Sequence, residues 1–159
     1  MSNLDFTGPH ISAAFLCEKV LVEPGNVPTF VRVVDRFTIP KFSGTLPPGV
    51  QLPPQQPLQF TLVVMLKSGD LGAGSHPLII KLQKPDKTYA STVEASIFFQ
   101  GGDDNGAMIM TPIGLPAPDE GLHWFDVLFE GELITRISLR VLFQPAVLQM
   151  QLPPAPGGD

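Results

Sequence analysis

Hydrophobic and polar residues alternate along most of this chain with a period of two, which is typical of β-strands. The clearest case runs from Gly121 to Phe143, where two segments rich in Val, Ile, Phe and Leu flank Glu130-Gly131. A glycine at this place can adopt the positive φ that a tight turn requires. The segment therefore predicts a β-hairpin.

A two-residue turn fixes the register of this hairpin, because antiparallel partners keep a constant sum of positions. Asp126 is then opposite Thr135, and Trp124 is opposite Ile137. One face of the hairpin carries Leu122, Trp124, Leu128, Leu133, Ile137 and Leu139. The other face carries Phe125, Val127, Phe129 and Ile134, together with Arg136, Ser138 and Arg140. Both faces need a cover, so Phe125, Val127 and Phe129 belong either to the core or to a surface that faces a partner. Together with Ile134 they are our candidate interaction surface.

Six further segments show a similar strand pattern, with turn residues between them. They span residues 10–22, 30–39, 58–67, 77–82, 88–99 and 107–113. The first two flank Glu23-Pro24-Gly25-Asn26 and should form another hairpin. No helical pattern is present. The sequence predicts an all-β fold, an antiparallel two-layer β-sandwich of about eight strands with Greek-key, immunoglobulin-like or C2-like connections.

A proline-rich segment interrupts the strand pattern between Pro40 and Pro57. Proline lacks the backbone donor that an interior strand needs, so we expect a surface crossing, the long connection of a Greek-key sandwich. Pro54 and Pro57 have the spacing of a Pro-x-x-Pro ligand, which is the alternative interpretation of this segment. We expect one domain over residues 1–145 and a flexible Pro- and Gly-rich tail over residues 146–159.

The composition is unusually apolar for a soluble domain. Charged residues make up 16% of the chain, against about 25% in ordinary domains. Either the core is large or another molecule covers part of the surface. The net charge of −5 argues against nucleic acid as a partner, and no apolar segment is long enough to span a membrane. The first residues do not resemble a secretory signal, and Cys17 is the single cysteine, so we expect a cytoplasmic protein.

Three parts of the chain resemble a family of short bacterial proteins known only as a domain of unknown function. These parts are Pro9-His10-Ile11 through Ala14-Phe15-Leu16-Cys17, Val33-Val34-Asp35-Arg36-Phe37, and His123-Trp124-Phe125-Asp126-Val127 with Thr135-Arg136 and Leu139-Arg140-Val141. They bracket most of the predicted domain. The resemblance implies a bacterial origin and a β-sandwich, and it implies no activity and no functional residues.

No group of residues has the spacing of a known catalytic, metal or cofactor site. The three histidines, His10, His76 and His123, are far apart in the sequence, and one cysteine cannot form a zinc cluster. Ser75-His76 lacks a nucleophile elbow. The glycines near these two residues lack the lysine of a phosphate loop, and Asp103-Asp104-Asn105 lacks the spacing of a calcium loop. We therefore expect no metal, no cofactor and no enzyme activity.

Asp35 and Asp126 lie within apolar strand segments, where a buried carboxylate must be paired or protonated. The candidate partners are Arg32, Arg36, Arg136 and Arg140. Of these, Arg136 and Arg140 form our candidate structural ion pairs with the two aspartates. A catalytic carboxylate is the alternative role.

These features favour a non-catalytic binding or structural protein that acts through protein–protein contacts or self-assembly. The alternative is a sandwich that binds carbohydrate or another small molecule through loop residues, with Trp124 or Tyr89 as a stacking surface.

Overall fold

The computed structural model describes residues 8–42, 49, 51, 57–101 and 105–146. The described residues form nine β-strands and no helix. The strands are β1 (His10–Glu23), β2 (Val27–Val34), β3 (Arg36–Phe42), β4 (Leu58–Lys67), β5 (Gly74–Gln83), β6 (Tyr89–Phe99), β7 (Gly106–Leu115), β8 (Gly121–Phe129) and β9 (Glu132–Ala146). Three segments discussed above lie outside the described residues. They are Pro54 of the Pro-x-x-Pro spacing, Asp103-Asp104, and the tail beyond Ala146.

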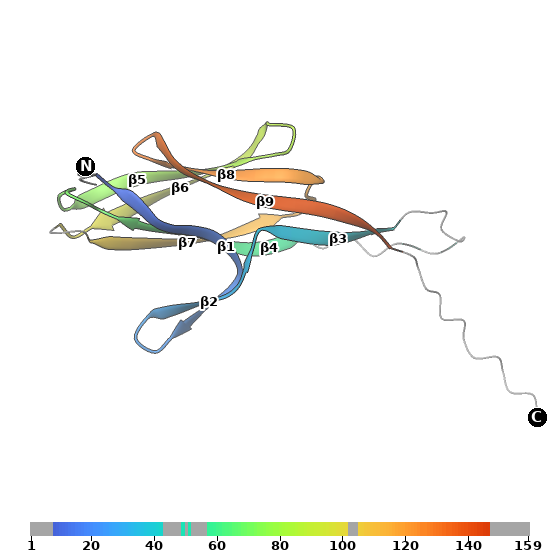
Figure 1. The fold of residues 1–159 in the computed structure, drawn as a ribbon, viewed down its shortest axis with the longest axis horizontal. Coiled ribbons are helices and arrows are strands. Elements are labelled where there is room, and N and C mark those ends of the chain that lie inside the picture. Colours follow the sequence, from blue (N-terminus) through green and yellow to red (C-terminus); the bar gives the residue numbers. More distant parts are fainter. Residues whose placement is uncertain (1–7, 43–48, 50, 52–56, 102–104, 147–159) are drawn as a thin grey trace, which may run out of the picture.

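The strands form two sheets that pack face to face (Figure 1). One sheet has four strands in the order β2-β1-β4-β7, and the other has five in the order β3-β9-β8-β5-β6. The predicted all-β sandwich is therefore confirmed. Its strands are not all antiparallel, however, because β3 and β9 pair in parallel.

This parallel pair exists because the predicted strand over residues 30–39 is in fact two strands. The chain bends at Asp35, leaves the four-stranded sheet after Val34 and joins the five-stranded sheet at Arg36. The carbonyl oxygen of Asp35 accepts a hydrogen bond of 2.8 Å from the backbone amide of Arg140, which ties the crossing to β9. A chain that changes sheet without reversing direction can meet the last strand in parallel. The division of the predicted strand into β2 and β3 accounts for nine strands instead of eight.

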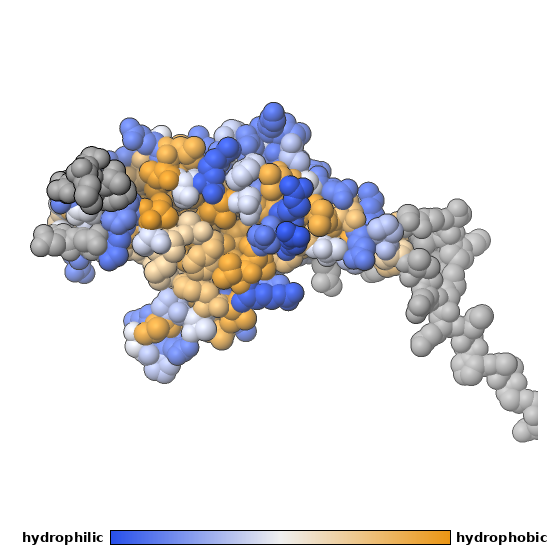
Figure 2. Space-filling model, viewed as in Figure 1, coloured by the Kyte–Doolittle hydropathy of each residue, from blue (hydrophilic) through white to orange (hydrophobic). Residues whose placement is uncertain are grey.

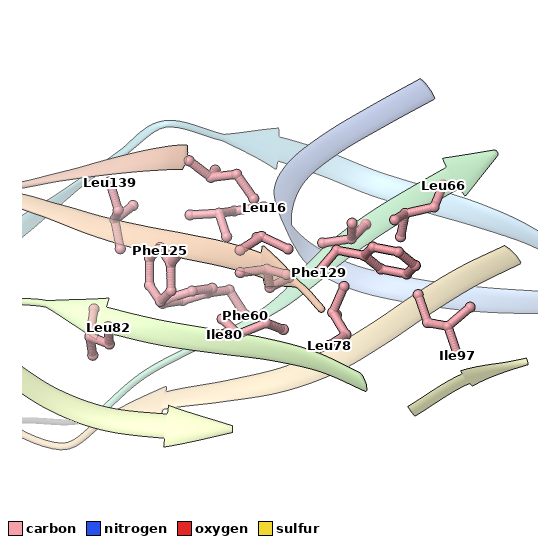
Figure 3. Close-up of a cluster of buried hydrophobic side chains, with 14 of the residues drawn as sticks. Leu16, Phe60, Leu66, Leu78, Ile80, Leu82, Ile97, Phe125, Phe129 and Leu139 are labelled. Atoms are coloured by element: carbon pink, nitrogen blue, oxygen red, sulfur yellow. The ribbon is translucent and has the colours of Figure 1, made fainter. Parts of the chain in front are cut away.

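The core lies between the inner faces of the two sheets (Figure 3). Phe60 of β4 and Phe125 of β8 meet across it edge to face, with ring centroids 5.8 Å apart. Around them pack fully buried aliphatic residues from both sheets, including Leu16, Leu62, Leu78, Ile80 and Leu139. Alternate residues of each strand supply this cluster, as the period-two pattern predicts.

The β8–β9 hairpin has the predicted turn, with φ of 50° at Glu130 and 87° at Gly131. The register follows the prediction at Phe129 and Leu128, which are opposite Glu132 and Leu133. It then shifts by one residue, because a bulge in β9 places Thr135 opposite Val127. Beyond it, Asp126 is opposite Arg136 instead of Thr135, and Trp124 is opposite Ser138 instead of Ile137.

The bulge moves Ile137 and Leu139 to the core face, beside Phe125 and Val127. Arg136 moves to the outer face, where Asp126 and Trp124 lie. The predicted distribution of residues between the faces of the hairpin is therefore correct for β8 and for Leu133 and Ile134, and wrong for β9 beyond the bulge.

Candidate functional site

The β1–β2 hairpin projects from the body of the sandwich (Figure 1). Its turn includes Gly25 and Asn26 at positive φ, and the amide of Asn26 donates a 3.1 Å hydrogen bond to the carbonyl of Glu23. We call its exposed large hydrophobic residues the apolar arm. They are Leu21 (43% exposed), Val22 (62%), Val27 (57%), Val31 (39%) and Val33 (62%). Figure 2 shows hydrophobic residues on this projection and on the adjoining surface of the sandwich.

The apolar arm is attached to the sandwich by an aromatic contact. Phe15 of β1 and Phe30 of β2 pack edge to face, with ring centroids 5.0 Å apart. Farther along, Arg32 of β2 forms an ion pair of 3.2 Å with Glu18 of β1. Thr29 also donates a hydrogen bond to the carboxylate of Glu23. These contacts join β1 to β2 and leave the other edge of β2 without a neighbouring strand in its sheet.

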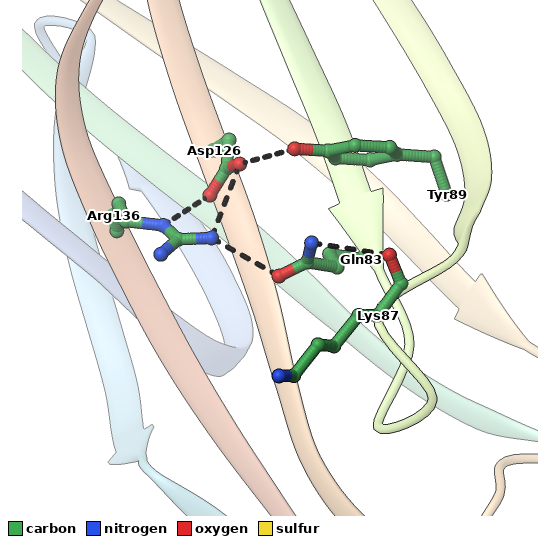
Figure 4. Close-up of polar contacts among 5 residues, drawn as sticks. All are labelled: Gln83, Lys87, Tyr89, Asp126 and Arg136. Carbon is green, nitrogen blue, oxygen red and sulfur yellow. Dashed lines mark hydrogen bonds and ion pairs between the residues drawn. The ribbon is translucent and has the colours of Figure 1, made fainter.

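A second surface lies on the outer face of the five-stranded sheet (Figure 4). We call it the polar–aromatic cluster. It consists of Lys81, Gln83, Tyr89, Trp124, Asp126 and Arg136. The strands β5, β6, β8 and β9 each contribute at least one of these side chains, so the cluster crosses most of the sheet.

Asp126 is the centre of this cluster, and its side chain is almost fully buried. Its carboxylate accepts hydrogen bonds from Arg136 Nε at 2.6 Å, from Arg136 Nη2 at 3.3 Å and from Tyr89 Oη at 3.0 Å. Arg136 Nη2 also donates to Gln83 Oε1 at 3.1 Å. The hydrogen bond to Asp126 raises the pKa of the Tyr89 phenol, and it also raises the pKa of the Arg136 guanidinium.

Both aromatic rings of the cluster carry a cation near one face. The guanidinium of Arg136 lies 5.0 Å from the ring centroid of Trp124, and the ammonium of Lys81 lies 5.9 Å from that of Tyr89. Tyr89 is 54% exposed, and Trp124 is half-buried. The hydrogen bonds therefore hold Tyr89 and Arg136 in place, and Trp124 and Lys81 lie beside them.

The structure corrects the candidate interaction surface. Phe125 and Val127 are fully buried and Phe129 is 3% exposed, and all three belong to the core. Ile134 is half-buried and packs against the same core. These residues face the other sheet of the same chain, because the five-stranded sheet turns this side of β8 inward. They are not available to a partner.

One of the candidate ion pairs forms as expected, between Asp126 and Arg136. Asp35 is exposed, which contradicts its predicted place among apolar residues, because it lies at the bend between the sheets. Its carboxylate lies 3.4 Å from Arg36 Nε. Arg140 contacts Asp35 through its backbone amide and not through its side chain.

His76 and His123 lie near opposite ends of β8. His76 Nδ1 is 2.8 Å from the Glu130 carboxylate, and the His76 ring stacks on Phe129 at 5.5 Å between centroids. His123 is buried, and desolvation lowers its pKa. Among the described residues, no three His, Cys, Asp or Glu side chains gather closely enough to hold a metal ion.

The polar–aromatic cluster lies on an open sheet face. Two hollows of about 210 and 380 Å³ lie elsewhere, against Pro112, Ile113 and Gly114 of β7, and neither is lined by a residue of the cluster. No helix long and apolar enough to cross a membrane is found in the described part of the chain. Because its sheet face is open, the cluster suits an extended ligand better than a ligand that must be enclosed in a pocket.

Sequence reasoning identified Asp126, Arg136, Trp124 and Tyr89. It named Arg136 among the candidate partners of Asp126, but it did not place Trp124 and Tyr89 beside this pair. Lys81 and Gln83 were missed altogether. They are ordinary polar positions of a strand, and only the pairing of β5 with β6 and β8 places them beside the others.

Comparison with solved structures finds proteins of similar fold. An immunoglobulin-like protein from Pseudomonas aeruginosa is 14% identical, with a TM-score of 0.44, over 84% of this chain and 95% of that one. A CARDB domain in complex with di-metal ions, from Pyrococcus furiosus, is 13% identical, with a TM-score of 0.40, over 89% and 95%. The alkylpurine DNA glycosylase AlkC from Pseudomonas fluorescens is 9% identical, with a TM-score of 0.42, over 81% and 30%.

At these identities the similarity concerns the fold alone. No curated protein matches the chain. The resemblance to a family of unknown function, inferred from residues at both ends of the domain, is confirmed. The sequence matches the family of unknown function DUF6941 over residues 12–142, and the chain therefore belongs to that family.

Proposed function

We propose that this protein is a non-catalytic binding protein that associates with a second copy of itself through the apolar arm. The observation that supports this proposal is the distribution of exposed hydrophobic residues. Among the described residues, five of the nine exposed large hydrophobic side chains belong to the arm. Exposed apolar residues that gather on one projection usually mark a contact with another molecule, because burial removes them from water.

A second copy fits this surface because β2 is an edge strand. Two β2 strands can pair antiparallel around a twofold axis, which is the symmetry of most protein dimers. With the axis at Phe30, Val27 of one copy lies opposite Val33 of the other. The only charged residue of β2 is Arg32, which forms its ion pair with Glu18 of the same chain. Like charges therefore do not oppose this pairing.

Light scattering coupled to size exclusion, over a range of concentrations, tests this proposal. We expect the wild-type protein to have twice the chain mass of 17.2 kDa. The double variant Val27→Lys/Val33→Lys should have the mass of one chain, because it places lysines opposite each other. Mixing it with Val27→Glu/Val33→Glu should restore the double mass, because lysine then faces glutamate. Leu133→Lys changes an exposed residue on β9 and serves as the matched control, which should remain dimeric.

A wild-type mass of 17.2 kDa at every concentration would overturn the proposal. So would a dimer that survives both lysines. Mixed charges that fail to restore the dimer would contradict the antiparallel arrangement of β2. The absence of enzyme activity and the cytoplasmic location, both expected from the sequence, stay predictions.

A further inference from the structure

The six residues of the polar–aromatic cluster belong to two parallel rows of side chains that run across the strands. In the first row, Ser138, Trp124, Gln83 and Tyr89 lie side by side on β9, β8, β5 and β6. In the second row, Arg136, Asp126, Lys81 and Thr92 lie side by side on the same four strands. Residues that are directly paired share a face of the sheet, so both rows are on the outer surface.

The first row presents two aromatic rings with an amide between them. Trp124 and Tyr89 are two strand spacings apart, about 10 Å. This separation is comparable to the length of a disaccharide. Partly exposed aromatic rings pack well against the C–H faces of sugar rings. The amide of Gln83 lies between the two rings; its oxygen accepts from Arg136 and its nitrogen donates to the carbonyl of Lys87, which leaves one amide hydrogen for a sugar hydroxyl group. The row is therefore suited to a saccharide chain that runs across the strands.

The second row carries a net positive charge in a chain whose net charge is −5. Lys81 and Arg136 are cations, and Asp126 supplies one negative charge, so the three side chains sum to +1. The carboxylate of Asp126 is already occupied by Tyr89 and Arg136. The salt bridges among the described residues do not include Lys81, whose ammonium lies over the Tyr89 ring. The row therefore has capacity for an acceptor that the protein does not provide.

We propose that this face binds an acidic saccharide, a chain of uronic acid residues, with sugar rings on Trp124 and Tyr89 and a carboxylate at Lys81 and Arg136. The network around Asp126 fixes Arg136 and Tyr89 before the ligand arrives, which reduces the entropy lost on binding. The cluster lies across four neighbouring strands of an open sheet face, which leaves room for an extended chain. The site is on a different sheet from the apolar arm, so this proposal does not depend on self-association.

The single tryptophan of the chain is in the site, so its fluorescence reports binding there. We would titrate the wild-type protein with oligomers of galacturonic, mannuronic and glucuronic acid, and with the methyl ester of each as a neutral control. At least one acid should give a saturable fluorescence change, and its ester should give none. The change should weaken at high salt, because the contact is ionic.

Two pairs of variants assign the binding to the cluster. Lys81→Gln should weaken binding about tenfold, whereas Lys19→Gln, an exposed lysine on β1, should leave it unchanged. Tyr89→Ala should weaken binding, whereas Tyr89→Phe keeps the ring and should bind the saccharide nearly as well as the wild type. Thermal unfolding of each variant shows whether it is folded at the temperature of the titration.

Four results would overturn the proposal. One is the absence of a response to all three acids at millimolar concentration. Another is an equal response to an acid and its ester. The third is an equal affinity of the Lys81→Gln and Lys19→Gln variants. Stronger binding of poly-glutamate than of any uronate would also overturn it, since the ligand would then be an acidic peptide.

Discussion

Arg136 lies directly opposite Asp126 on the neighbouring strand, with its Nε 2.6 Å from the carboxylate. This pairing depends on the bulge in the β8–β9 hairpin, which advances β9 by one residue. Without the bulge, Thr135 would be opposite Asp126 and Arg136 would point into the core. A single extra residue near the turn therefore places a cation where the buried carboxylate needs it.

Loss of the Asp126 charge should destabilise the fold. In Asp126→Asn, Arg136 and Tyr89 keep a neutral partner in place of a carboxylate. Hydrogen bonds to charged groups contribute more than neutral ones, so we expect the free energy of unfolding to fall by about 1.5–3 kcal/mol. Urea denaturation measures this. The exposed control Glu132→Gln should behave as the wild type, and equal midpoints for both variants would contradict the role given to Asp126.

Tyr89 should ionise above its ordinary pKa of 10.0, because it donates a hydrogen bond to Asp126. It is the only tyrosine of the chain, so the ultraviolet absorbance of tyrosinate reports on it alone. Because the folded-state pKa is raised, Tyr89 contributes stability below pH 10 that is lost as the pH rises through the folded pKa. Asp126→Asn should move the titration back toward 10.0. A titration that is the same in both proteins would contradict the hydrogen bond.

The sequence was sufficient for the architecture, because the period-two pattern depends on local alternation. It placed the turn at Glu130-Gly131 correctly, and it separated the two faces of β8 correctly. It could not show the bend at Asp35, since Val33, Val34, Arg36 and Phe37 suit a strand in either sheet. It could not show the bulge either, because an extra residue in a continuous strand leaves no signal in composition.

The candidate site was only partly predictable for a related reason. Asp126 stood out as a carboxylate in an apolar strand, and its partner was proposed among nearby arginines. Gln83 and Lys81 belong to a strand that is distant in the sequence, and their place beside Trp124 depends on strand order. Strand order is a property of tertiary packing that one sequence does not specify.

Buried His123 should make the fold sensitive to mild acid. Desolvation lowers its pKa from 6.5, and among the described residues its Nδ1 has no hydrogen-bond partner. The stability that it contributes is present above pH 6.5 and is lost as the pH falls through the folded pKa, because the unfolded chain takes up the proton first.

The variant His123→Leu removes this titration. Its free energy of unfolding at neutral pH should stay within about 1 kcal/mol of the wild type. The variant removes the unpartnered Nδ1 from the core, and it also removes the hydrogen bond between the imidazole ring and the backbone of Gly121. Urea midpoints measured at several pH values below 6.5 should fall less in the variant than in the wild type. Equal slopes would show that other groups cause the acid sensitivity.

Gly121, at the start of β8, should not tolerate a side chain. Its φ is +131°, and a Cβ atom would lie 2.9 Å from Cβ of Pro85. We expect Gly121→Ala to lower the free energy of unfolding by about 1–3 kcal/mol. Gly114→Ala is the matched control, because no atom lies within 4 Å of its added Cβ. Thermal unfolding compares the two, and a Gly121→Ala protein as stable as the control would contradict the contact with Pro85.

The most direct test of self-association through the arm is hydrogen exchange at the backbone amides of β2. We would compare the wild-type protein at high concentration with Val27→Lys/Val33→Lys, and use the amides of β4 as an internal reference. If β2 pairs with a second copy, the β2 amides that point away from β1 should exchange slowly in the wild type and fast in the variant, while the amides of β4 should be equally slow in both. Equally fast exchange of β2 in both proteins would contradict the proposed contact.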